Sequence, residues 1–143
     1  MPTLHLGVLN VPYATSGTTT GEVATFLEDK YHVMEVFFED VGAPAIGAAL
    51  EKSAQDAVDS IILGIAAPGI SLTAKAEGEI VDAFRQFLTQ QEMDGVVKGV
   101  PTQAALKGVS HRRKKPYAKG NPPRPSFIDT GTYESHFRAW VEP

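Results

Sequence analysis

Histidine, cysteine and serine are the side chains that most often bind metals or attack substrates, and their spacing here favours neither chemistry. The four histidines are His5, His32, His111 and His136, and none has the paired spacing of a metal motif. His32 lies beside an apolar helical stripe and is predicted to be a partly buried core residue. There is no cysteine, and no serine lies in a Gly-x-Ser-x-Gly sequence. The sequence therefore predicts no metal, no cofactor and no catalytic residue.

Two short motifs suggest catalysis at first sight. Residues 127–132 read Phe-Ile-Asp-Thr-Gly-Thr, which resembles the active-site turn of aspartic peptidases. That chemistry needs two carboxylates about 3 Å apart that share a proton, and a homodimer could supply the second one. Only twelve residues follow Gly131 and a helical pattern precedes it, so Asp129 is instead predicted to cap a turn. Residues 17–22 resemble a phosphate loop but lack its Lys-Ser/Thr pair, which predicts a flexible linker.

Charge is divided between two regions of the chain. Residues 1–94 carry fourteen acidic and four basic side chains, whereas residues 95–128 carry eight basic side chains and no acidic one. Residues 111–125 combine six bases with four prolines, so no helix or strand is predicted there. Such a loop could bind a phosphate backbone. It lacks stacked aromatic residues and an accompanying recognition helix, which favours contact with an acidic protein surface over nucleic-acid binding; a plain solvated loop is the third interpretation.

The elements that must hold these residues are mainly helical. Thr19 and Glu22 have the spacing of a capping box, and an apolar stripe at helical spacing follows over residues 23–41. Pro44 is expected to end or kink this helix, or to begin a second one that stops at Gly64. An apolar loop is predicted at residues 65–70, a third helix over about 73–91, and one or two helical turns over 101–107.

Residues 1–143 are predicted to form one domain of the α+β class, mostly helical, with a small antiparallel sheet. The sheet would pair an N-terminal with a C-terminal strand, the latter with Ser135, Phe137, Ala139 and Val141 on one side. A short helix through Tyr133, Phe137 and Trp140 fits the same stretch nearly as well, and a turn followed by a strand is favoured. The predicted parts are an N-terminal arm or strand with a linker (1–20), a helical core (21–108), a long extended basic loop (109–128) and a turn with the C-terminal strand (129–143). The expected core anchors are Phe26, Phe37, Phe38, Phe84, Phe87 and Trp140.

The C-terminal stretch resembles a class of viral proteins. Residues 124–141 read Arg-Pro-Ser-Phe-Ile-Asp-Thr-Gly-Thr-Tyr-Glu-Ser-His-Phe-Arg-Ala-Trp-Val, which looks like the end of small virion proteins of tailed bacteriophages. Segments 93–95 and 99–109 have the same character. The turn at residues 130–133, followed by an apolar strand, is similar to the Thr-Gly-x-Leu turn of neck and tail-completion proteins. The resemblance covers roughly the last third of the chain.

The resemblance implies a non-catalytic structural protein that forms a ring in the phage neck or tail, as head–tail connector, collar or tail terminator. Its partners would be further copies in a ring, six-fold in preference to twelve-fold, and neighbouring neck and tail proteins. Genomic DNA in the lumen of the ring could contact the protein non-specifically. The N-terminus lacks a signal peptide pattern and no apolar run is long enough to cross a membrane, so synthesis in the host cytoplasm and a place in the virion are expected.

The ring contact is expected to join the basic loop of one copy to acidic helices of the next. A long loop that reaches a neighbour makes a heterologous contact, as ring closure requires. Three alternatives stay open: a baseplate or other tail-assembly component, a DNA-binding module that uses the loop, and a dimeric aspartic peptidase. The expected interface residues are Arg112, Arg113, Lys114, Lys115, Lys119 and Arg124 on one side, and Glu28, Asp29, Glu35 and Glu39 on the other.

Overall fold

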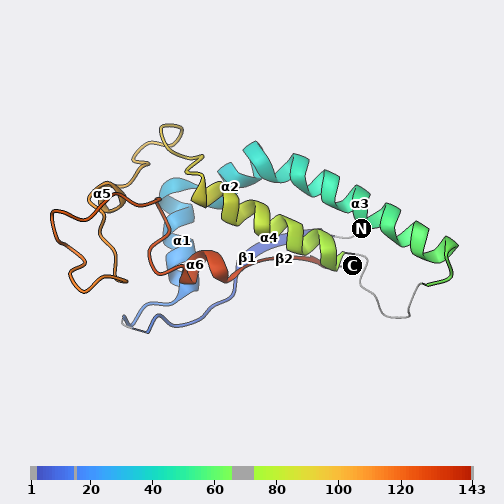
Figure 1. Cartoon of the computed structure of the whole chain (residues 1–143), viewed down its shortest axis with the longest axis horizontal. Helices are drawn as coiled ribbons and strands as arrows, with labels where there is room; N and C mark the ends of the chain where they lie inside the picture. The colour runs from blue at the N-terminus through green and yellow to red at the C-terminus, as the bar shows by residue number, and fades with distance from the viewer. Residues whose placement is uncertain (1–2, 15, 66–72, 143) are drawn as a thin grey trace.

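A computed structural model describes residues 3–14, 16–65 and 73–142 (Figure 1). Helices dominate and two strands form an antiparallel sheet, so the predicted α+β class is confirmed. Of the apolar loop predicted at residues 65–70, all but Ile65 lies outside the described residues. The elements in chain order are β1 (Thr3–Val8), α1 (Thr20–Tyr31), α2 (Val33–Phe37), the π-helix η1 (Phe38–Gly42), α3 (Ala43–Ile62), α4 (Ala74–Thr89), α5 (Gln103–Leu106), α6 (Thr132–Ser135) and β2 (Phe137–Glu142).

Helix α1 begins at the predicted capping box. The Thr19 hydroxyl accepts a hydrogen bond from the Glu22 N–H (3.3 Å), and the Glu22 carboxylate accepts one from the Thr19 N–H (2.9 Å). The stripe that predicts a single helix is divided at His32, which has a left-handed backbone with φ of 53°. Glu28 stabilises this break, because its carboxylate accepts two backbone N–H groups of α2 (2.8 and 3.2 Å). His32 is exposed, so its predicted core position is wrong.

Pro44 does not interrupt the helical path. The π-helix η1 leads directly into α3, and the N–H of Ala43 bonds to the carbonyl of Phe38, five residues earlier. Pro44 lies in the first turn of α3, a position that suits proline because its fixed φ is already helical. The second of its two predicted roles is therefore confirmed. Gly64 follows the end of α3 with φ of 68°, as predicted for a residue that terminates a helix.

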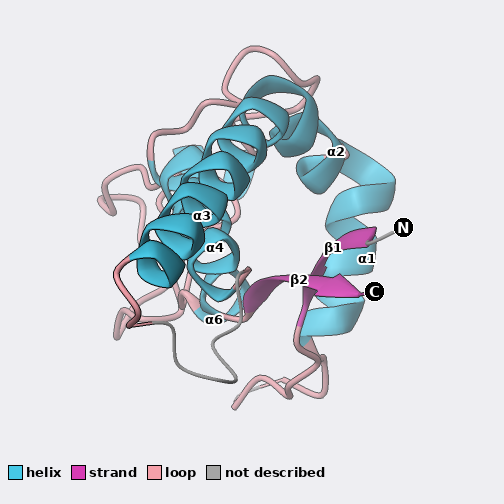
Figure 2. Ribbon diagram, turned by 90° about the vertical axis from the view of Figure 1, so that its right-hand side faces the viewer, coloured by secondary structure: helices cyan, strands magenta, loops and turns pink. Residues whose placement is uncertain are grey.

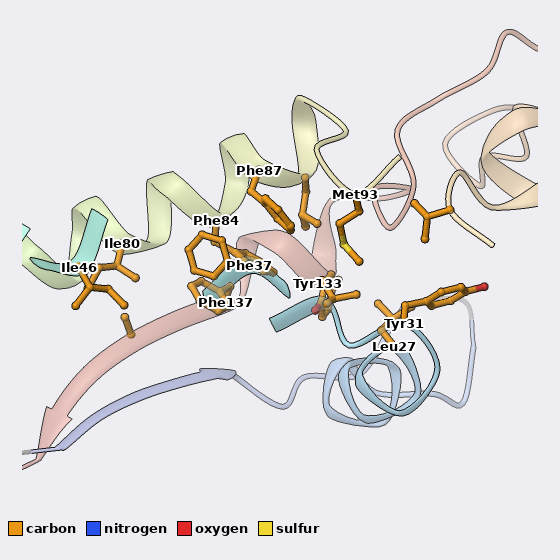
Figure 3. Packing of buried hydrophobic residues seen from close by; sticks show 14 residues of the cluster. Leu27, Tyr31, Phe37, Ile46, Ile80, Phe84, Phe87, Met93, Tyr133 and Phe137 are labelled. Carbon is orange, nitrogen blue, oxygen red and sulfur yellow. The ribbon is translucent and has the colours of Figure 1, made fainter. Parts of the chain in front are cut away.

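Four phenylalanine rings form the centre of the core (Figure 3). Phe37 of α2 meets Phe84 and Phe87 of α4 edge-on, with ring centroids 5.2 and 5.5 Å apart. Phe137 of β2 stacks on Phe84 with a centroid distance of 3.9 Å. All four side chains are almost fully buried, which confirms the predicted core positions of Phe37, Phe84 and Phe87. The core therefore joins α2, α4 and the C-terminal strand.

Three other aromatic residues predicted in the core are exposed. Phe26, Phe38 and Trp140 have exposed fractions of 57%, 46% and 39%, so these predictions are wrong. Trp140 stacks on His5 across the two strands at 5.3 Å, and the Lys30 ammonium lies 5.4 Å from the centre of the Phe26 ring. The rings of Trp140 and Phe26 are each covered by one neighbouring side chain. The prediction of burial was based on the size of the aromatic rings and could not anticipate this local cover.

The two strands join the ends of the chain. Their register pairs Val8 with Phe137 and Thr3 with Glu142. Phe137 and Ala139 are buried, so the predicted pairing and the core-facing side of β2 are confirmed, whereas Ser135, predicted on the same side of the strand, lies in α6. Helix α4 packs against β2, and α3 packs against α4, giving the order α3, α4, β2, β1 across the molecule (Figure 2).

The two ends of the elongated molecule carry different elements. Figure 1 places α5 and the loops around it at one end, and the C-terminal end of α3 at the other. Helices α1 and α6 lie close to the loop end. Within the part of the chain that the structure describes, no helix is long and apolar enough to cross a membrane. The basic loop, residues 109–128, therefore lies at one end of the long axis.

Candidate functional site

The basic loop, defined as residues 109–128, contains no helix or strand, as predicted, and is held in place by Arg124. The guanidinium of Arg124 donates hydrogen bonds to the carbonyls of Val109 (2.5 Å), Pro125 (3.0 Å) and Ile128 (2.9 Å). Its backbone N–H bonds to the carbonyl of Ala105 in α5 (3.0 Å). Arg124 thus ties both ends of the loop together, and its charge is used inside the chain.

Further contacts fold the loop back against α5. The Asn121 side-chain amide donates to the carbonyls of Lys115 (3.0 Å) and Pro116 (2.9 Å). Gly108 has φ of 63°, and a Cβ there would lie only 2.2 Å from the carbonyl oxygen of Pro122, so only glycine allows this approach. Such anchoring reduces the entropy that the loop loses when it meets a partner.

Four cations of the loop point away from these anchors. Arg113, Lys114, Lys115 and Lys119 are exposed, and their side chains form no ion pair with any described residue. Arg112 differs, because its guanidinium donates to the carbonyl of Thr130. Of the six predicted basic interface residues, these four are the ones whose charges are not used within the described chain.

Asp129 links the beginning of the loop to its end. Its carboxylate accepts the N–H of His111 (3.0 Å) and pairs with Nδ1 of the same imidazole. Burial alone would raise the pKa of Asp129, but hydrogen bonds from His111 and Ser110 and the charge of Arg124 outweigh it and lower the pKa. An ionised carboxylate bound to an imidazole differs from the proton-sharing pair of an aspartic peptidase. The predicted structural role of Asp129 thus takes the form of a link across the loop.

The predicted acidic interface residues lie on α1, α2 and η1. The carboxylate of Glu28 caps α2, and that of Glu35 pairs with Nδ1 of His32 (2.9 Å). Asp29 and Glu39 are exposed and form no ion pair with any described residue. No ion pair among the described residues joins these acids to the basic loop of the same chain. The charges that are free for a partner are therefore on Asp29 and Glu39.

A cluster of possible metal ligands was not predicted from the sequence. One ligand atom each of Glu28, His32 and Glu35 lies within 4.8 Å of the others. The signal was the spacing of four and three residues between His32 and the two acids, although the helix breaks at His32 and the acids lie on α1 and α2. A search for paired histidines does not detect it. Because Glu28 already accepts two backbone N–H groups and His32 pairs with Glu35, hydrogen bonding within the chain accounts for this cluster.

A pocket of about 440 Å³ opens beside the basic loop. Its apolar wall comes from α1 and from Phe127, whose ring lies 5.2 Å from that of Tyr31. Burial and the nearby charge of Asp129 raise the pKa of Tyr13, which lies on the polar side. The ammonium of Lys30 lies 5.1 Å from the ring centre of Tyr31. The pocket is thus an apolar hollow next to several cations, of a size that can receive a few side chains.

The turn that carries the phage resemblance lies at the edge of this pocket. Gly131 has φ of 83° and begins α6, which leads into β2. A turn, a short helix and a strand therefore follow one another where the sequence predicts a turn and a strand.

Comparisons of the chain with protein-family models, with curated proteins and with solved structures find no match.

Proposed function

We propose that this chain is a structural subunit that assembles into a homo-oligomeric ring in the neck or tail of a tailed bacteriophage. The observation that carries the proposal is the set of four exposed cations on the anchored loop, which have no acidic partner among the described residues. An anchored group of like charges favours a surface of opposite charge, and the remainder of the chain is acidic. The resemblance of residues 124–141 gives the setting.

The acidic surface of the neighbouring copy supplies the complement. Asp29 of α1 and Glu39 of η1 are exposed and unpaired within the described chain, so each can meet a lysine or arginine without breaking an internal bond. Glu28 and Glu35 contribute less, because both are used within the chain. Basic loop and acidic helices are different surfaces, so the contact is heterologous and can close a ring.

A matched pair of double variants tests this contact. Lys114→Gln with Lys115→Gln should lower the oligomer mass measured by light scattering, because it removes two of the four free cations. Lys98→Gln with Lys107→Gln removes the same charge from two exposed lysines outside the loop and should leave the mass unchanged. Circular dichroism should show the same fold for both. Equal masses for the two variants would contradict a contact made by the loop.

DNA binding is the second candidate function. Tyr117 lies among the loop cations and is 73% exposed, and aromatic rings beside cations can stack on bases. A gel shift of duplex DNA that weakens steeply with salt would support this function, and Tyr117→Ala together with the loop double variant should abolish it.

A further inference from the structure

Helix α3 has an apolar surface that nothing in the described chain covers. Its inward side, formed by Ile46, Ala49 and Ser53, is buried. The outward side carries what we call the α3 patch, which becomes more exposed toward the end of the helix that projects from the molecule (Figure 1). The patch consists of Leu50, Val58, Ile61, Ile62, Leu63 and Ile65, with exposed fractions between 39% and 75%.

The size of the α3 patch is that of a protein contact. The exposed fractions correspond to roughly 500 Å² of apolar surface, at the upper end for the largest patch of a monomer. Covering it with an equal area of another surface would bury about 1,000 Å² in total, the minimum expected of a specific contact. Single exposed hydrophobic residues are common, but five gathered at one helix end, with Leu50 further along the same helix, indicate an interaction surface.

The charged residues beside the α3 patch indicate which kind of surface could cover it. Glu51, Gln55 and Asp59 follow one another at four-residue spacing beside it, so one flank of the patch is acidic. In an antiparallel pair of α3 helices, this flank would face the same flank of the other copy, and like charges would repel. A surface with an apolar centre and a basic rim is complementary instead.

The pocket beside the basic loop has an apolar wall, Lys30 over two of its lining rings, and Arg124 and His111 in its lining. Its apolar wall includes Val23, Phe26, Leu27 and Phe127. Lys30 lies over the rings of Phe26 and Tyr31, and the free cations of the basic loop follow His111, which also lines the pocket. Figure 1 places α1 and the loop end, which line the pocket, away from the C-terminal end of α3, which carries most of the patch. No single copy can therefore bring them together.

We propose that the α3 patch of one copy inserts into the pocket of the next, as the apolar part of a head-to-tail contact. This inference rests on the proposed homo-oligomer and names where the copies join. Apolar side chains would fill the centre, and the acidic flank with Glu51 and Asp59, in place of Asp29 and Glu39, would face Lys30 and the basic loop. Because the two surfaces are different and lie at opposite ends, each copy offers one of each to its neighbours. Such a contact forms a ring when its rotation closes.

Crosslinking between single-cysteine variants tests the contact directly, because the chain has no cysteine of its own. Ile62→Cys marks the patch and Phe26→Cys marks the pocket, and both positions are exposed, so neither change should disturb the fold. The two proteins carry tags of different size and are mixed with a short bismaleimide. We expect a crosslinked pair that contains one protein of each size. Ala48→Cys, an exposed position of α3 about 21 Å from Ile62 along the helix axis, replaces Ile62→Cys as the matched control and should give at least tenfold less product.

Each other outcome overturns the inference in a recognisable way. Crosslinking of Ile62→Cys with itself would mean that copies pair through the same surface. Absence of the mixed pair, in a protein that light scattering shows to be an oligomer, would refute this contact and leave the proposed ring standing. Absence of the mixed pair in a monomeric protein would refute both proposals. Circular dichroism of each variant verifies that the fold is intact before the mixture is made.

Discussion

Individual residues at the loop end serve the chain itself as much as any partner. Arg124 and Asp129 were singled out by charge and by motif, yet both make their principal bonds within the chain. The sequence alone cannot show that Arg124 binds within the chain, because the carbonyls that it binds become neighbours only after the loop folds. Sequence correctly locates the basic residues, and the structure separates the anchoring cation from the free ones.

Acid should reveal the contribution of Asp129 to stability. Because its pKa is lowered in the folded state, its ionised form stabilises the fold above the ordinary value of about 3.9, and this stabilisation is lost as the pH falls through the lower folded pKa. At neutral pH, Asp129→Asn should reduce the free energy of unfolding by about 1–2 kcal/mol. Urea unfolding at pH 7 and pH 3 should show the difference from the parent protein shrinking at pH 3. A difference that does not depend on pH would contradict the ionised link to His111.

A buried hydroxyl on α3 should be dispensable. Ser53 is buried and its Oγ has no hydrogen-bond partner among the described residues, whereas Oγ of Ser60 donates to the carbonyl of Asp56 (2.8 Å). Ser53→Ala should raise the free energy of unfolding by about 1 kcal/mol, because it removes an unpaired polar group and alanine favours helices. Ser60→Ala, on the same helix, is the control and should change it less. Destabilisation by Ser53→Ala, measured by urea unfolding, would show that the hydroxyl has a partner.

The helix and strand features that depend on local sequence signals were predicted correctly. The capping box at Thr19, the stop at Gly64 and the pairing of the terminal strands are all confirmed, because each depends on neighbouring residues or on simple alternation. The break at His32 was missed, since it depends on a carboxylate four residues earlier that caps the next helix. The pocket was missed as well. Its wall combines α1 with segments around residues 102 and 127, and no sequence pattern predicts that association.

Anchoring of the basic loop can be measured by proteolysis. Trypsin cleaves after lysine and arginine, and the loop offers several such sites at residues 112–119 that must unfold locally to be cut. Arg124→Ala should speed cleavage there roughly tenfold, because it removes the bonds that join the two ends of the loop. Lys98→Ala, an exposed lysine outside the loop, should leave that rate unchanged. Equal rates, followed by mass spectrometry, would mean that Arg124 does not anchor the loop.

On the scale of the whole molecule, opposite ends present complementary surfaces. The loop end has an apolar pocket and, elsewhere on the basic loop, free cations, and the α3 end has apolar side chains beside Glu51 and Asp59. An isolated copy would leave both ends uncovered, at a cost in exposed apolar surface. Repetition of one head-to-tail contact covers both ends of every copy, which is the arrangement expected of a ring subunit.

The molar mass of the purified protein at low and high salt tests the central claim most directly. Light scattering at low ionic strength should give one discrete oligomer, with six copies the favoured number. At about 1 M salt, where charges are screened within about 3 Å, the mass should fall toward that of the single chain. A monomer at every salt concentration would contradict self-assembly through charged surfaces. An oligomer whose mass does not respond to salt would contradict the role of the basic loop in holding it together.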